Sequence, residues 1–309
     1  APAQPLITTT TSLTNDATPT IEGIAEAGST VNLYNDTESA TYVVTVESKT
    51  SEHTYDGTGS SLGYKIDGVF SPFLTFTPGN TYRFDQSDSS NANHPLRFYL
   101  EAERSNIYST GVTTNGTPGQ AGAYTEITVS DATPSELHFQ CAFHGYMGDA
   151  VYTSLGTTTA DETTGAYTIT PAELSDGDYS LTVTATDAAG NISAASDALS
   201  MTVDATAPAQ PAITTTTTLT SDATPTIEGT AEADSTVTLL SGGVAIGTTT
   251  ANGDGQFSIT TSTLADSNYA LTVTATDAAG NISAASSALN LTVDTIAPAQ
   301  PSITTTTSL

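Results

Sequence analysis

The chain has 309 residues and carries 33 acidic against 5 basic side chains, for a formal net charge of −28. So few Lys and Arg residues exclude a nucleic acid as a partner, because nothing would neutralise its phosphates, and they disfavour an anionic membrane surface. A surface this acidic repels itself unless cations bind or salt screens it. The single cysteine allows no internal disulfide, and no apolar run is long enough to insert into a membrane.

The sequence repeats itself. Ala-Pro-Ala-Gln-Pro occurs at residues 1–5, 207–211 and 297–301, each time followed after one residue by Ile-Thr-Thr-Thr-Thr. Residues 1–40 match 207–246, and the match resumes at Gly156, which corresponds to Gly247. An insertion therefore occupies 41–155, where the second copy has the Gly242-Gly243 hairpin, and a hairpin tip accepts an inserted domain at low cost.

This comparison predicts four segments. Residues 1–40 plus 156–206 form a first, discontinuous repeat, 41–155 form the insert, 207–296 form a second repeat, and 297–309 supply the first strand of a further one. The chain therefore reads as an excerpt of a longer protein. Composition marks the same boundaries, because every Lys, Arg, His and Cys residue lies in the insert.

The insert is predicted to be all-β. Short segments rich in aromatic and β-branched residues alternate with turn residues. The expected strands are 42–46, 63–66, 74–76, 81–85, 96–100, 125–129 and 137–141, with a turn at 77–80 and a loop at 115–119.

The complete second copy also predicts an antiparallel all-β fold. Seven short segments of alternating polarity fit into about 90 residues, which is typical of an immunoglobulin-like sandwich. The expected strands are 212–218, 224–233, 235–240, 244–251, 256–261, 269–276 and 288–293.

Three segments carry a resemblance to the tandem bacterial Ig-like repeats of large surface adhesins: 222–229, 276–281 and 293–298. The resemblance covers the chain outside the insert. It implies an extracellular rod made of repeats, with partners among the repeats of the same chain, like chains in a filament, or a surface or glycan receptor.

The most distinctive chemistry lies at residues 139–148. Cys141, His144 and Met147 occur within seven residues, and His94 lies upstream in Asn93-His94-Pro95-Leu96. One thiolate, two imidazoles and one thioether form the ligand set of a mononuclear blue-copper site. We expect Cys141 to end a strand and the other two residues of its motif to fold back from the following loop.

A His near the middle and Cys-x-x-His-x-x-Met near the end make the insert similar to the cupredoxin family, and similar modules occur in structural proteins of marine phages. The resemblance implies a Greek-key β-barrel or sandwich, with His94, Cys141 and His144 as equatorial copper ligands and Met147 as the axial one. Pro95 departs from the family, which often places an Asn after this His; Asn93 precedes it instead. The alternative is a copper-free descendant with a buried Cys141 thiol.

The other two histidines are not expected to bind copper. His138 is predicted to lie on the strand face opposite Cys141, and His53 is predicted to be solvated in a polar loop.

Acidic residues recur at equivalent places in the two repeats, and related adhesin arrays use Ca²⁺ at domain junctions. Oxygen ligands of this kind suit Ca²⁺, although Asx turns explain the same pattern. The predicted calcium ligands are Asp16, Asp187, Asn191, Asp204, Asp222, Asp277, Asn281 and Asp294.

No arrangement of residues indicates catalysis, so no enzymatic activity is predicted. The sequence favours a repeat segment of an extracellular fibre or adhesin that displays a cupredoxin-like module. The alternatives are a surface protein that binds copper or transfers electrons, and a virion fibre.

Overall fold

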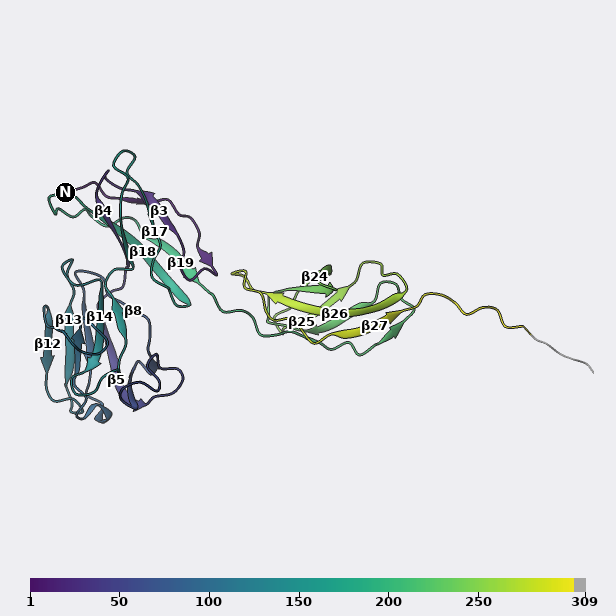
Figure 1. The fold of residues 1–309 in the computed structure, drawn as a ribbon, viewed down its shortest axis with the longest axis horizontal. Coiled ribbons are helices and arrows are strands. Elements are labelled where there is room, and N and C mark those ends of the chain that lie inside the picture. The colour runs from purple at the N-terminus through teal and green to yellow at the C-terminus, as the bar shows by residue number, and fades with distance from the viewer. Residues whose placement is uncertain (303–309) are drawn as a thin grey trace, which may run out of the picture. The chain divides into compact units, whose positions relative to one another are not determined.

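The structure, a computed structural model, describes residues 1–302 and contains two compact units, Ala1–Asp204 and Ala205–Leu309. Figure 1 shows that both are built of strands joined by loops. No described residue lies in an α-helix; the one helical segment is the short 3₁₀ turn η1 (Ser89–Asn91). Accordingly, no helix in this part of the chain has the length and apolar character needed to cross a membrane. The predicted all-β class is confirmed.

Within the second unit, two sheets face each other around one core. The predicted strand 212–218 is divided, because the chain leaves the first sheet after Ile213 and joins the second at Leu219. The three-stranded sheet has the order β20 (Ala212–Ile213), β22 (Thr226–Thr230), β25 (Gln256–Thr260). The five-stranded sheet has the order β21 (Leu219–Thr220), β27 (Leu289–Val293), β26 (Ser267–Thr276), β23 (Thr236–Ser241), β24 (Val244–Thr250).

The same pattern of sheets recurs in the first unit, outside residues 40–152. Its three-stranded sheet is β1 (Leu6–Ile7), β3 (Ile21–Ile24), β17 (Ala166–Ile169). Its five-stranded sheet is β16 (Gly156–Thr159), β4 (Thr30–Asn35), β18 (Gly177–Thr186), β19 (Leu199–Val203), β2 (Leu13–Thr14).

The two repeats differ at one hairpin. In the second repeat, β23 and β24 are joined by Gly242 and Gly243, which both have positive φ. Their counterparts β4 and β16 keep the same register, with Gly156 opposite Leu33 as Gly247 is opposite Leu239. The whole insert lies between the end of β4 and the start of β16.

Residues 40–152 contribute two further sheets. The first is β11 (Ile107–Tyr108), β10 (Leu96–Tyr99), β14 (Glu136–Cys141), β15 (Ala150–Tyr152), β8 (Leu74–Thr75). The second is β12 (Val112–Asn115), β13 (Tyr124–Thr128), β9 (Thr81–Asp85), β5 (Ala40–Ser48), β6 (Leu62–Ile66), β7 (Val69–Phe70). Strands β7, β11, β12 and β15 were not predicted, because they are short and have no clear alternating pattern.

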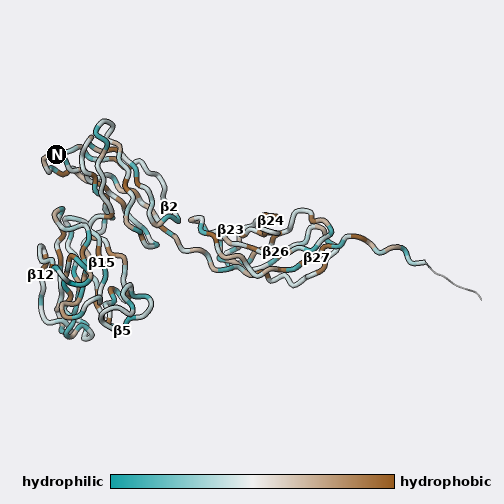
Figure 2. Tube along the Cα trace, in the orientation of Figure 1, coloured by the Kyte–Doolittle hydropathy of each residue, from teal (hydrophilic) through white to brown (hydrophobic). Residues whose placement is uncertain are grey.

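Each repeat and the insert has its own hydrophobic core. Strand residues alternate between buried and exposed, as in β3 and β25, and hydrophobic residues recur along the tube in Figure 2. The insert core is the most aromatic, and Phe76 stacks on Tyr82 at 4.0 Å between ring centroids. Burying such rings is the main stabilising term for a small sandwich.

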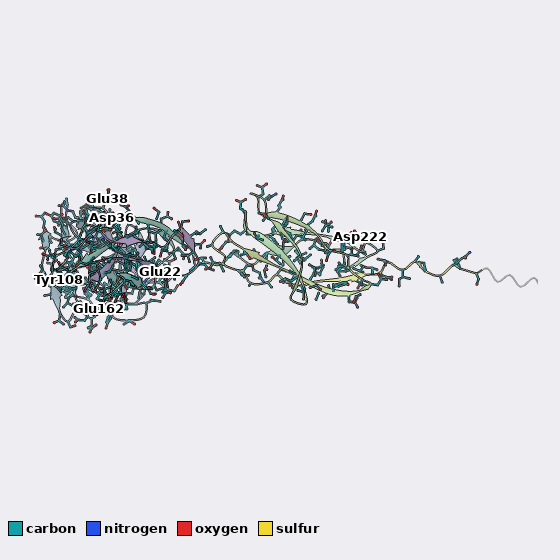
Figure 3. All side chains as sticks on the ribbon, turned by 90° about the horizontal axis from the view of Figure 1, so that it is seen from above. Glu22, Asp36, Glu38, Tyr108, Glu162 and Asp222 are labelled. Atoms are coloured by element: carbon teal, nitrogen blue, oxygen red, sulfur yellow. The ribbon has the colours of Figure 1, made fainter. Side chains whose placement is uncertain are left out.

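The acidic residues lie mainly on the surface. Glu22, Glu38 and Glu162 are exposed on the first unit, and Figure 3 labels them together with Asp222 of the second. Within residues 1–302, the three ion pairs lie in the insert, where the basic residues are. The repeats therefore carry an uncompensated negative charge.

Residues 297–302, at the start of the predicted further repeat, lie in no strand. The rest of that predicted segment, 303–309, is outside the described residues.

Candidate metal centre

The predicted copper ligands come together at one end of the insert. Cys141 is the last residue of β14, and His94 lies two residues before β10. These strands pair antiparallel with Leu96 opposite Cys141, which brings the two ligand segments side by side. Cys141 ends a strand as predicted, whereas His94 lies just before a strand rather than at its end.

The side-chain donor atoms of His94, Cys141 and His144 all lie within 4.8 Å of one another. Cys141 Sγ is 3.4 Å from His144 Nδ1 and 3.8 Å from His94 Nδ1. The two imidazole rings are 4.8 Å apart between centroids. Among residues 1–302, this is the only group of three or more His, Cys, Asp or Glu side chains close enough together to share a metal ion.

The donors differ in exposure. Cys141 is fully buried, His94 is partly buried and His144 is exposed. Burial, and to a lesser degree the neighbouring His144, lowers the pKa of His94, which favours the neutral imidazole that a metal ion requires. The thiol sulfur also accepts a hydrogen bond from the Phe143 backbone N–H at 3.4 Å.

Met147 is buried in the same hydrophobic cluster as Cys141. Its backbone carbonyl accepts two hydrogen bonds, one from the Tyr64 N–H at 2.6 Å and one from His53 Nε2 at 3.1 Å. The loop that carries His144 and Met147 is therefore tied to β6 and to the 49–61 loop.

The prediction that His53 is solvated is wrong. Its side chain is 3% exposed, and its Nδ1 accepts the Tyr55 N–H at 3.0 Å, so Nε2 carries the proton that is donated to Met147. Burial lowers its pKa. The local sequence is polar, but the ring packs 5.4 Å from the Phe70 ring, a contact that local composition does not reveal.

The backbone of His94 is held by two buried side chains. The Tyr64 hydroxyl donates to its carbonyl at 2.7 Å, and Gln86 Nε2 donates to the same oxygen at 2.9 Å. Asn93, which precedes His94 where the family often has an Asn after it, is exposed and has a positive φ. Tyr64 and Gln86 hold the His94 backbone instead, and no local sequence pattern marks either residue.

Arg104 approaches the site from the β10–β11 connection. Its Nη1 donates to the Ala142 carbonyl at 2.7 Å and to the Cys141 carbonyl at 3.3 Å. These two hydrogen bonds hold the backbone at the end of β14, next to the sulfur. Burial raises the pKa of Tyr64 well above its usual value, and Cys141 adds to the shift, so this neighbour of the sulfur stays a neutral phenol.

His138 lies away from the cluster. Its Nε2 is 3.3 Å from Glu136, and it is paired across the sheet with Tyr99. The prediction that His138 faces away from Cys141 is consistent with this position.

The predicted calcium residues lie in surface turns. Asp187 Oδ1 accepts the backbone N–H groups of Ala189 and Asn191, and its Oδ2 accepts the Asn191 amide at 2.8 Å. Asp277 and Asn281 repeat this arrangement, while Asp16 and Asp222 each cap a turn through a following Thr. Ca²⁺ at these residues, and at Asp204 and Asp294, stays a prediction.

Two segments, residues 147–205 and 209–295, match the family model of a bacterial Ig-like domain. No curated protein matches this sequence.

Similar solved structures include fibronectin(III)-like modules of Clostridium thermocellum CbhA, at 14% identity over 72% of this chain and 90% of that one, with a TM-score of 0.32. They also include the BSP domain of a biofilm-associated protein, at 10% identity over 92% and 76% of the two chains and a TM-score of 0.25. The D0-D1 domain of intimin is 10% identical over 94% and 99%, with a TM-score of 0.20. TM-scores this low support no conclusion about this chain. Together with the two matched segments, the sheets described above show that the chain carries tandem Ig-like repeats.

Proposed function

We propose that this chain is part of an extracellular, adhesin- or fibre-type repeat protein, whose first repeat displays a cupredoxin-like module that binds one copper ion. The Ig-like repeats support the surface role, because such repeats serve as spacers and attachment modules. The convergence of Cys141, His94 and His144 carries the metal-binding part of the proposal.

The donor set fits copper. For Zn²⁺, whose bonds to imidazole nitrogen are about 2.0–2.1 Å and to thiolate sulfur about 2.3 Å long, the bound nitrogen and sulfur atoms lie roughly 3.5 Å apart, which is the spacing of a small metal site in general. The observed separations of 3.4 and 3.8 Å are close to this value. His94, Cys141 and His144 would hold the ion, and the buried thioether of Met147 favours copper over zinc as a fourth, soft donor.

Electron transfer is a second candidate function, and the exposure of the site favours it. His144 is exposed and Phe143 is 66% exposed, so one ligand edge of the site reaches solvent beside an apolar ring. A bound copper ion would supply one-electron chemistry there. The chain itself supplies a buried sulfur, a His94 whose backbone carbonyl is held by Tyr64 and Gln86, and a β-sheet frame that limits rearrangement.

The test is copper titration of the full chain, followed by optical and EPR spectroscopy. We expect one copper per chain and an intense thiolate-to-copper absorption band with narrow copper hyperfine splitting. Both signals are lost in Cys141→Ser and kept in His138→Ala, a matched control because His138 lies on the same strand outside the cluster.

Absence of stoichiometric copper, or equal spectra for Cys141→Ser and the wild type, would refute the copper proposal. The surface role is measured separately, as binding of the chain to cell or glycan surfaces. That binding should survive Cys141→Ser, because the repeats do not depend on the thiol.

A further inference from the structure

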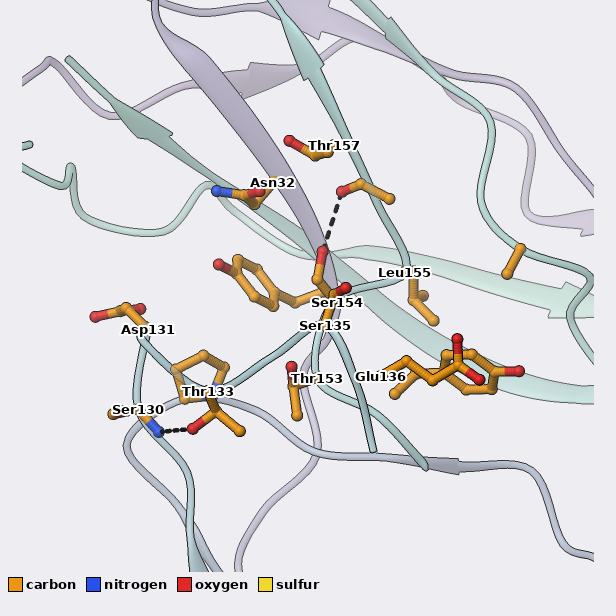
Figure 4. A pocket seen from close by; sticks show the side chains of 15 residues that line it. Asn32, Ser130, Asp131, Thr133, Ser135, Glu136, Thr153, Ser154, Leu155 and Thr157 are labelled. Carbon is orange, nitrogen blue, oxygen red and sulfur yellow. Dashed lines mark hydrogen bonds between the residues drawn. The ribbon is translucent and has the colours of Figure 1, made fainter. Parts of the chain in front are cut away.

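A polar cleft of about 340 Å³ lies where the first repeat meets the insert. Figure 4 shows side chains from both parts pointing into it. Asn32 and Tyr34 of β4 and Thr157 of β16 come from the repeat, whereas Asp131 and Ser135 come from the connection between β13 and β14 of the insert. The volume falls in the range of small-ligand sites.

Several polar groups in this cleft have no hydrogen-bond partner among residues 1–302. The side chains of Asn32, Asp131, Ser135 and Thr157 make no hydrogen bond to any residue in the described range 1–302. They offer an amide, a carboxylate and two hydroxyls, a mixture of donors and acceptors. Polar groups that converge in a concave site without internal partners are available to a ligand.

The charge of the cleft limits the class of ligand. Its ionisable carboxylates are Asp131 and Glu136, and no Lys, Arg or His lines it. Phosphate, sulfate and uronic acid groups would therefore be repelled, in a chain with a net charge of −28. A bound metal ion is not indicated either, because no three carboxylates converge in residues 1–302.

The walls of the cleft also have apolar parts. Tyr34 and Leu155 are largely buried beneath it, and Pro78 contributes ring carbons. A ligand that suits this lining has hydroxyls around its edge and C–H groups on its faces, and carries no negative charge. From this combination we infer that the cleft binds a neutral glycan segment of one or two sugar units.

This inference goes beyond the metal centre and does not depend on copper. A sugar in the cleft would contact the repeat and the insert at once, so binding would couple them and raise the stability of the Ala1–Asp204 unit by mass action. The insert would then serve the attachment role by completing a site that the second repeat, with its Gly242-Gly243 hairpin, cannot form.

The experiment uses the full chain and a panel of uncharged disaccharides: cellobiose, lactose, maltose and N,N′-diacetylchitobiose. Saturation-transfer NMR detects binding and calorimetric titration measures it, with sialyllactose as the charged comparison. We expect at least one neutral disaccharide to bind, and Asn32→Ala and Ser135→Trp each to weaken its binding tenfold or more. Glu162→Gln, a change at an exposed acid outside the cleft, should leave binding unchanged.

Circular dichroism shows whether the Ser135→Trp variant folds. If it does not, the sugar binding of Asn32→Ala alone tests the inference. The inference is overturned if no panel member binds the wild type, or if both cleft variants bind as well as Glu162→Gln. It is equally overturned if sialyllactose or a lysine-rich peptide binds the cleft in preference to the neutral sugars.

Discussion

His53 acts on the proposed metal loop through the backbone rather than as a ligand. Its ring lies between Phe70 and Tyr55, and its Nε2–H meets the Met147 carbonyl. A buried hydrogen bond of this kind fixes the path of a loop that contains no regular secondary structure. The same carbonyl also accepts the Tyr64 N–H, so the peptide that follows Met147 is held from two sides.

Replacing His53 with Ala should therefore destabilise the first unit by about 1–3 kcal/mol, because a buried hydrogen bond is lost and a cavity forms. Urea denaturation measures the change. His138→Ala is the control, since that ring is partly buried as well but lies on β14 and makes no hydrogen bond to the metal loop within residues 1–302. If both variants lower the free energy of unfolding by the same amount, the hydrogen bond from His53 to the Met147 carbonyl is not what holds the loop.

At the scale of elements, the ligand loop depends on a glycine where it returns toward β14. A Cβ atom on Gly148 would lie 1.7 Å from the Phe139 carbonyl oxygen. Gly145, in the same loop, has room: its nearest neighbour would be Arg104 Nε at 3.6 Å. The close packing against β14 brings Met147 into the core.

We expect Gly148→Ala to cost about 1–3 kcal/mol through overpacking and to reduce copper uptake. Gly145→Ala should leave both nearly unchanged. Thermal unfolding and metal titration of the two variants in parallel check this. Equal behaviour of the pair would show that the return of the loop does not require glycine.

The hydrogen bonds of the Asp187 turn lead us to expect that folding stability depends on pH. Hydrogen bonds from the Asn191 side chain and backbone lower the pKa of Asp187 below its usual 3.8. A carboxylate with a lowered pKa in the folded state contributes stability above its unfolded pKa, and this contribution is lost as pH falls through the folded value. Asn191→Ala should raise the pKa of Asp187 toward 3.8. The stability that the charged carboxylate contributes should then be lost at a higher pH than in the wild type.

Carbon-detected NMR titration of the carboxyl groups measures this change. The copy at Asp277 is an internal reference: burial acts to raise its pKa, but hydrogen bonds from Asn281 lower it, and these stay intact in the variant. A shift at both sites, or at neither, would contradict the turn model. Adding CaCl₂ to the wild type in the same experiment tests the calcium prediction, since a bound ion would move the Asp187 resonance.

At the scale of the whole molecule, the repeat and the insert are joined by partly buried polar contacts as well as by two chain connections. The Tyr82 hydroxyl donates to the Thr37 carbonyl at 2.8 Å and accepts the Thr77 N–H at 2.9 Å. Asn35 Nδ2 donates to Thr75 Oγ1 at 3.0 Å across the same boundary. Removing one partner leaves the others without this hydrogen bond in a place that water reaches only in part.

Tyr82→Phe should therefore lower the stability of the Ala1–Asp204 unit by about 1–3 kcal/mol and leave that of the second unit unchanged. Calorimetry of the full chain resolves this as a shift in one unfolding transition. Tyr108→Phe is the control, because its hydroxyl makes no hydrogen bond to a residue in the described part of the chain. A shift in both transitions would mean that the effect is not local to the boundary.

Comparison of the chain with itself located the insert, because near-identical repeats expose any added segment. The same reasoning identified Cys141, His144 and Met147 as a group, since their spacing within one short loop is a local property. It also placed His94 near Cys141, because paired strands are a common way to join distant ligands. The fold class and the position of the proposed metal ligands were thus determined by the sequence.

The tertiary structure alone decided which residues support that group and what lies beside it. Tyr64, Gln86, His53 and Arg104 come from four separate segments, and no periodicity marks a side chain that bonds to a distant carbonyl. The cleft likewise exists only because Asn32 and Ser135, far apart in the chain, meet at the boundary between repeat and insert. Local patterns specify strands and short loops, whereas contacts between distant segments depend on how the cores pack, and packing is set by the whole chain together.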